Sequence, residues 1–268
     1  MQETKVYLLD CGTMSLDQSY MFLDAGLTGQ RRFPVYGVLV DHAEGKFIFD
    51  TGFDAGHIQN VASFTEPEQS AQQSIPGQLD MIGVRPSQIT HVVNSHYHID
   101  HCGGNKYCTH ATTICHQCEL EVLKAPAPNE QLAYSDLSFA PGIRQATPPS
   151  ADVGVAPDLY TPRFETLKGD QELAKGVFLF ETPGHTPGHY SLLVKLASRR
   201  PMLFTADACY SRKNLDMRCI QAGNHDPARA LESLDRLVTL AERHDAEMFF
   251  SHDPESWPLY QRAPGYYS

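Results

Sequence analysis

The chain has 268 residues, and 21 lysines and arginines against 32 aspartates and glutamates give it a formal net charge of −11. Apolar residues make up 41% and charged residues 20%, a balance that is typical of a folded globular protein and excludes a disordered chain. The acidic excess argues against a nucleic-acid partner, because a phosphate backbone attracts clustered lysine and arginine. No apolar run approaches the roughly 20 residues that span a bilayer, so we expect no membrane segment.

The amino-terminal residues and the number of cysteines bear on the cellular compartment in which the protein is expected. Residues 1–5 lack a basic stretch followed by an apolar one, so we expect no secretory signal. Seven cysteines, an odd number, then favour free thiols in a reducing environment, which predicts a cytoplasmic protein. Cys115 and Cys118 have the spacing of a metal knuckle, but no second pair follows, so we interpret them as structural thiols.

Short runs of β-branched and aromatic residues, separated by turn residues, predict strands along much of the chain. The expected strands cover residues 6–9, 35–41, 46–50, 90–93, 112–115, 177–181, 190–196, 202–205 and 247–251. A hairpin turn at 43–45 and a helical stretch near 78–82 interrupt the first group. Two groups of strands, each followed by helices, predict an α/β fold with two sheets packed face to face and helices outside.

The clearest predicted helix covers residues 227–243. Asp226 can cap it and Pro227 suits its first position. Its expected apolar stripe consists of Leu231, Leu234, Leu237, Val238 and Ala241. Before it, between residues 125 and 162, prolines recur and periodicity disappears, so we expect a Pro-rich insert or cap on a single domain of residues 1–268.

Side chains that bind metals gather directly after the predicted strand 90–93. Residues 94–101 contain three histidines and one aspartate within six positions, His96, His98, Asp100 and His101. His96 and His98 are two apart in an extended segment and therefore project to the same side. His185, Asp207 and His252 each follow a later predicted strand. Because binding loops gather at strand ends on a rigid scaffold, we expect these seven side chains to meet.

The other histidines lack this context. We interpret His189 as a packing or surface residue that could support a ligand, and we assign no role to seven more: His42, His57, His91, His110, His116, His225 and His244.

The order His-x-His-x-Asp-His, then a Pro-Gly-His turn, an aspartate and a late histidine, resembles the metallo-β-lactamase superfamily. Residues 49–52 match its early loop, and the resemblance covers nearly the whole chain. It implies an αβ/βα sandwich of two mixed sheets and two divalent metal ions. One ion would be held by His96, His98 and His185, the other by Asp100, His101 and His252, with Asp207 bridging them. Asp50 would orient a ligand from behind. Imidazole and carboxylate donors suit zinc first, and cobalt, manganese and iron fit the same set.

The segment 207–210, Asp-Ala-Cys-Tyr, resembles the Asp-Ala-x-Tyr of N-acyl-homoserine lactone lactonases, whose tyrosine faces the lactone carbonyl. His98, where flavodiiron proteins carry an acid, and the Asp100–His101 pair argue against other branches of the superfamily. The resemblance therefore implies a hydrolase that opens a lactone ring with a water activated between two metals. Asp100 would move the proton and Tyr210 would bind the carbonyl oxygen.

Two other lactonases remain as alternatives. Residues 33–36, 94–107 and 134–139 resemble 4-pyridoxolactonase of vitamin B6 degradation, while 241–246 and 252–254 resemble short-chain γ-lactone hydrolases. A pyridoxolactone would need cationic anchors, for which the candidates are Arg31, Arg32, Arg163 and Arg212. An acyl-lactone needs an apolar slot, for which the candidates are Tyr20, Met21, Phe22, Phe53 and Phe64. The resemblance also implies a homodimer that acts on a small-molecule lactone.

Overall fold

The computed structural model describes residues 3–140, 143 and 162–268. The first sheet has the order β1-β2-β3-β4-β5-β6. Its strands are β1 (Lys5–Asp17), β2 (Gln30–His42), β3 (Gly45–Phe49), β4 (His91–Val93), β5 (Thr112–His116) and β6 (Arg163–Leu167). The first three strands pair antiparallel, and β3 to β6 run parallel. This mixed sheet supplies half of the scaffold.

The second sheet has the order β11-β10-β9-β8-β7. Its strands are β7 (Gln171–Ala174), β8 (Val177–Glu181), β9 (Tyr190–Val194), β10 (Met202–Phe204) and β11 (Glu247–Phe249). Among the described strand pairs of this sheet, β10 and β11 are parallel and the other three pairs are antiparallel. The predicted two-sheet α/β fold is therefore confirmed.

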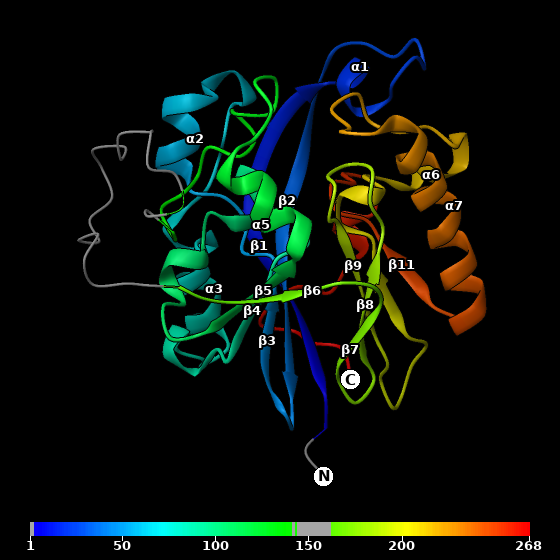
Figure 1. The fold of residues 1–268 in the computed structure, drawn as a ribbon. Helices are drawn as coiled ribbons and strands as arrows, with labels where there is room; N and C mark the ends of the chain where they lie inside the picture. Colours follow the sequence, from blue (N-terminus) through cyan, green and yellow to red (C-terminus); the bar gives the residue numbers. More distant parts are fainter. Residues whose placement is uncertain (1–2, 141–142, 144–161) are drawn as a thin grey trace.

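Helices cover the outer faces of both sheets (Figure 1). The α-helices are α1 (Gln18–Met21), α2 (Ala55–Val61), α3 (Ile75–Met81), α4 (Ile99–Cys102), α5 (Gln117–Lys124), α6 (Arg212–Met217) and α7 (Pro227–His244). Short 3-10 helices are η1 (Ser63–Thr65), η2 (Ala71–Gln73), η3 (Pro86–Gln88), η4 (Asn105–Tyr107), η5 (Ala206–Ala208) and η6 (Trp257–Leu259). Within the described ranges, no helix has both the length and the apolar character needed to cross a bilayer.

Alternation along the strands separates three apolar layers. Leu8, Val38 and Phe49 point from the first sheet toward Leu192 and Phe204 of the second, and form the core between the sheets. The residues between them, such as Leu9 and Leu39, face α2 and α3 on the other side. On the far side of the second sheet, Leu193 and Leu203 pack against α7. Burying both faces of each sheet holds the strand ends in a fixed relation.

The structure corrects several expected boundaries. Strands β1 and β2 are longer than predicted, because their outer halves stay paired although they mix buried apolar residues such as Met14 and Phe33 with polar ones and show no regular apolar alternation. Helix α7 is capped by Asp226 as expected, but Val238 is 37% exposed and lies off its buried face. That face consists of Ala230, Ser233, Leu234, Leu237 and Leu240. Most of the Pro-rich insert expected at 125–162 lies outside the described residues.

Candidate metal centre

The structure brings together all seven side chains that the sequence singled out. The first cluster comprises His96, His98 and His185, and the second comprises Asp100, His101, Asp207 and His252; in each, the candidate ligand atoms lie within 4.8 Å of one another. They follow the carboxyl ends of β4, β8, β10 and β11. His98 and Asp100 are partly exposed while the other five are buried, so the centre opens to solvent on their side.

One carboxylate joins the two clusters. Oδ2 of Asp207 lies 3.3 Å from Nε2 of His185 and 3.8 Å from Nε2 of His96. Its other oxygen, Oδ1, lies 3.1 Å from Nε2 of His252 and 3.3 Å from Nε2 of His101. Asp207 therefore presents one oxygen to each cluster, which is the arrangement of a bridging ligand.

Asp100 completes the second cluster of candidate ligands, and His98 completes the first. Oδ2 of Asp100 lies 3.5 Å from Nε2 of His252 and 3.6 Å from Nε2 of His101. Nδ1 of His98 lies 3.0 Å from Nε2 of His185. Four ligands about 2.05 Å from a tetrahedral zinc ion are separated by about 3.3 Å, so these spacings fit such an ion.

Buried polar atoms without partners point to the same conclusion. Nε2 of His96, His101 and His252 and Oδ1 of Asp207 have no hydrogen-bond partner within the described residues. A buried polar atom without a partner costs on the order of 1–3 kcal/mol, and four of them face the two clusters. Divalent ions at these positions would satisfy all four, so the residues present fit a dinuclear centre.

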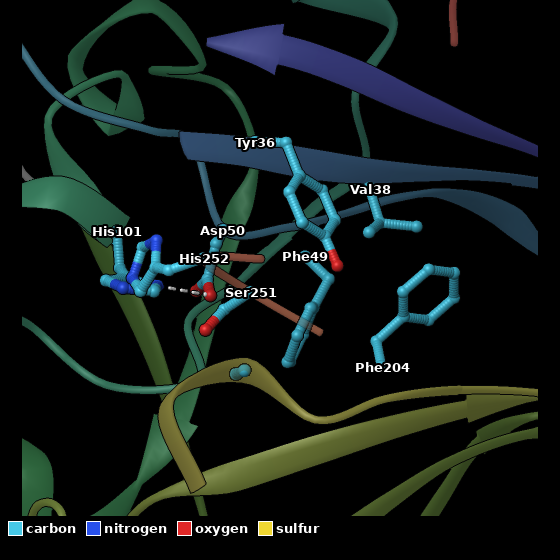
Figure 2. A pocket seen from close by; sticks show the side chains of 9 residues that line it. Tyr36, Val38, Phe49, Asp50, His101, Phe204, Ser251 and His252 are labelled. Atoms are coloured by element: carbon cyan, nitrogen blue, oxygen red, sulfur yellow. Dashed lines mark hydrogen bonds and ion pairs between the residues drawn. The ribbon is translucent and has the colours of Figure 1, made fainter. Parts of the chain in front are cut away.

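Contacts behind the ligand rings orient them. Nδ1 of His101 donates to Oδ2 of Asp50 at 2.8 Å, and Figure 2 shows this bond beside a small cavity between the sheets. Nδ1 of His252 donates to the carbonyl oxygen of Pro34 at 2.9 Å. Nδ1 of His96 lies 2.9 Å from the hydroxyl of Ser95. Because each Nδ1 faces an oxygen acceptor, each Nε2 keeps its lone pair for a metal.

Asp50 is held firmly for this role. Its φ of +56° places it in the left-handed region, which a non-glycine residue adopts at a cost. Besides His101, it accepts hydrogen bonds from the backbone nitrogen and the hydroxyl of Ser95, at 2.8 and 2.6 Å. The position that the resemblance implied for Asp50, behind a ligand, is the one the structure shows.

Protonation differs between the two clusters. Burial lowers the pKa of His96 and His98 well below the usual value for histidine. Burial also acts on His101 and His252, but the negative charges of Asp207 and Asp100 outweigh it and raise their pKa. Protons therefore compete with a metal more strongly at the second cluster than at the first.

Tyr210 lies beside the clusters and is buried. Its ring meets that of His252 edge-on at 4.8 Å and lies 6.1 Å from that of His185. Burial, and then the negative charge of Asp207, raise the pKa of Tyr210 well above its usual value. The phenol therefore keeps its proton and can donate a hydrogen bond.

Two further residues support the ligands. The sequence left a supporting role for His189 open beside packing or a surface role, and the structure favours support: His189 is fully buried and its Nε2 accepts a hydrogen bond from the backbone nitrogen of Asp207 at 3.0 Å. Its place four residues after His185, in a repeated Pro-Gly-His, was the available signal. Gln221, which contacts His185, had no such signal.

The residues expected to line an apolar slot differ in burial. Met21, Phe22 and Phe53 are buried in the same apolar layer as Tyr210, whereas Tyr20 is 38% and Phe64 63% exposed. The negative charges of Asp100 and Asp207 reach Tyr20, so this residue lies near the clusters. The candidate anchors form surface contacts: Arg31 with Glu255, Arg32 with Glu66 and Glu68, Arg163 with the carbonyl of His110, and Arg212 with Asp216. All seven cysteines are free, and neither Cys115 nor Cys118 joins a metal-binding group among the described residues.

Comparison with known proteins gives consistent results. The sequence model of the metallo-beta-lactamase superfamily matches residues 31–252. The N-acyl homoserine lactonase AttM of Azorhizobium caulinodans is 30% identical over the whole of both chains, and the N-acyl homoserine lactonase AiiA of Bacillus thuringiensis subsp. kurstaki is 28% identical over 94% of each. A solved N-acyl homoserine lactone hydrolase, with the product N-hexanoyl-L-homoserine bound at its catalytic metal center, is 26% identical, with a TM-score of 0.81 and full coverage of both chains.

Proposed function

The chain belongs to the metallo-beta-lactamase superfamily, and from this premise we propose that it is a dinuclear metal-dependent hydrolase that opens the lactone ring of N-acyl homoserine lactones. The observation that carries the proposal is the carboxylate of Asp207, whose two oxygens face different histidine clusters. Tyr210 stands beside both clusters, where its hydroxyl could reach a lactone carbonyl. The lactonases AttM and AiiA, similar over nearly the whole chain, support this substrate class.

Ring opening needs a nucleophile at neutral pH and a partner for the oxygen that becomes negative. Two divalent ions would supply the first by acidifying a water, and would polarise the carbonyl. The protonated hydroxyl of Tyr210 would donate a hydrogen bond to the carbonyl oxygen as its charge develops. Asp100, on the open side, would take a proton from the attacking water on a carboxylate oxygen. The ring C–O bond then breaks, and Asp100 returns this proton to the leaving alkoxide oxygen.

The finer assignments belong to the same proposal. His96, His98 and His185 would hold one ion, Asp100, His101 and His252 the other, and Asp207 both. Zinc is our first choice, because the donors are imidazoles and carboxylates without a thiolate. The homodimer and the cytoplasmic location stay predictions. No contact of the four candidate arginines favours 4-pyridoxolactone over an acyl-lactone.

The test is a direct assay. Chelator-treated protein, reloaded with two equivalents of zinc, cobalt or manganese, is incubated with N-acyl homoserine lactones of several chain lengths and with 4-pyridoxolactone. We expect the acyl lactones to gain one water, as mass spectrometry would detect, and the chelated protein to be inactive. Preferred turnover of 4-pyridoxolactone would replace the proposed substrate, and full activity with one ion or none would remove the dinuclear mechanism.

A further inference from the structure

Gln221 lies beneath the first cluster and is only 1% exposed. Its amide nitrogen lies 2.8 Å from Nδ1 of His185 and 2.7 Å from the backbone oxygen of Asp207. One side chain thus connects a ligand of the first cluster to the residue that both clusters share. Neither a motif nor a predicted element singled out this position.

The backbone holds Gln221 in place from both sides. The carbonyl of Ile220 accepts a hydrogen bond from the backbone nitrogen of Leu23 at 2.9 Å. The backbone nitrogen of Ala222 donates to the carbonyl of Tyr20 at 2.8 Å. Because both neighbours are pinned to the segment around α1, the amide has little freedom to leave His185.

His185 needs such a partner. The rings of His96, His101 and His252 have oxygen acceptors behind Nδ1, whereas Nδ1 of His185 faces the Gln221 amide. The amide nitrogen donates to the carbonyl of Asp207, so it also meets Nδ1 of His185 as a donor. A metal ion on Nε2 requires the ring proton on Nδ1, and the amide must then turn its oxygen toward Nδ1. A hydrophobic side chain of similar size would leave Nδ1 without a partner.

We propose that Gln221 is the positioning residue of His185 and thereby sets the affinity of the first cluster for its metal ion. This inference rests on the metal-dependent function proposed above. Groups that orient a metal-bound histidine from behind are typically worth 10- to 100-fold in metal affinity.

The test measures metal affinity. Metal-free wild type, Gln221→Met and Gln221→Glu are titrated with Co²⁺ in competition with a chelator, and the visible absorption of bound cobalt reports ligand geometry. The same variants in a His252→Ala background report the first cluster alone. We expect Gln221→Met to bind the first ion 10- to 100-fold more weakly, with an altered spectrum and unchanged far-ultraviolet circular dichroism.

Gln221→Glu separates positioning from packing. Glutamate offers only acceptors and therefore suits the proton that Nδ1 of His185 carries when Nε2 binds a metal, so we expect Gln221→Glu to bind the first ion more tightly than Gln221→Met does. If the residue only filled space, the uncharged methionine would be at least as good as a buried carboxylate.

Gln78→Met is the matched control. Gln78 is also buried, and its side chain bonds the backbone of Asp10 at 2.8 Å and of Gln72 at 2.9 Å, away from the clusters. Unchanged affinity in Gln221→Met, methionine at least equal to glutamate, or an equal loss in Gln78→Met would each overturn the proposal. Wild type that binds two ions but opens no lactone would contradict the proposed function alone, and wild type that binds no ion would overturn both.

Discussion

Nδ1 of His101 lies 2.8 Å from Oδ2 of Asp50, a residue with a φ of +56°. Asp50→Asn should weaken binding of the second ion by roughly 10- to 100-fold, because the amide nitrogen would face either His101 or the donors of Ser95. Chelator competition measures this loss, and Asp80→Asn, at an exposed aspartate, serves as its control. An unchanged second ion in Asp50→Asn would show that Asp50 does not orient His101.

Asp207→Ala should abolish binding of both ions, because its two oxygens face different clusters. His185→Ala should disturb mainly the first ion, and His252→Ala mainly the second. Metal content of the purified variants, measured by mass spectrometry, distinguishes these patterns, with His110→Ala at an exposed histidine as the control. Two bound ions in Asp207→Ala would mean that this carboxylate does not bridge.

Tyr210→Phe should retain both ions and the fold while kcat/KM falls about 30- to 1,000-fold, since an oxyanion hydrogen bond is worth about 2–4 kcal/mol. A fall in kcat/KM near tenfold is expected if the metal ions already stabilise most of the negative charge on the carbonyl oxygen. The effect should be equal for lactones of every chain length, because the hydroxyl would touch the ring ester. A loss confined to long acyl chains would make Tyr210 part of the pocket wall, and unchanged kinetics would leave it as packing.

The two ions should respond differently to acid. His101 and His252 have a raised pKa in the metal-free chain, so a metal must displace their protons, and lower pH favours those protons. His96 and His98 have a lowered pKa, so they favour the neutral imidazole and protons compete less with a metal there. Affinity for the second ion should therefore fall about tenfold per pH unit for each displaced proton below neutrality, while the first ion falls less. Cobalt titrations between pH 7.5 and about 5.5 test this order, and simultaneous release of both ions contradicts it.

Much of the ligand set could be predicted from the sequence, because four of its members lie close together along the chain. His96 to His101 stand within one short segment after a short strand, and the adjacent buried valines of that strand mark where it ends. The later ligands follow β8, β10 and β11, which are short apolar runs of the second sheet, so the same signal marks them although only β10 is buried at every position. The two-sheet class followed from the two groups of predicted strands, each followed by helices.

Long-range contacts decided the rest. No local pattern states that the two oxygens of Asp207 diverge toward different clusters, that His189 holds the Asp207 backbone, or that Gln221 meets His185 across 36 positions. Nor does periodicity place Val238 outside the buried face of α7, because the sheet beneath determines which side of an amphipathic helix is covered. Residue types and strand ends establish which groups could bind a metal. Only the packing of distant loops establishes which atom of each group faces it.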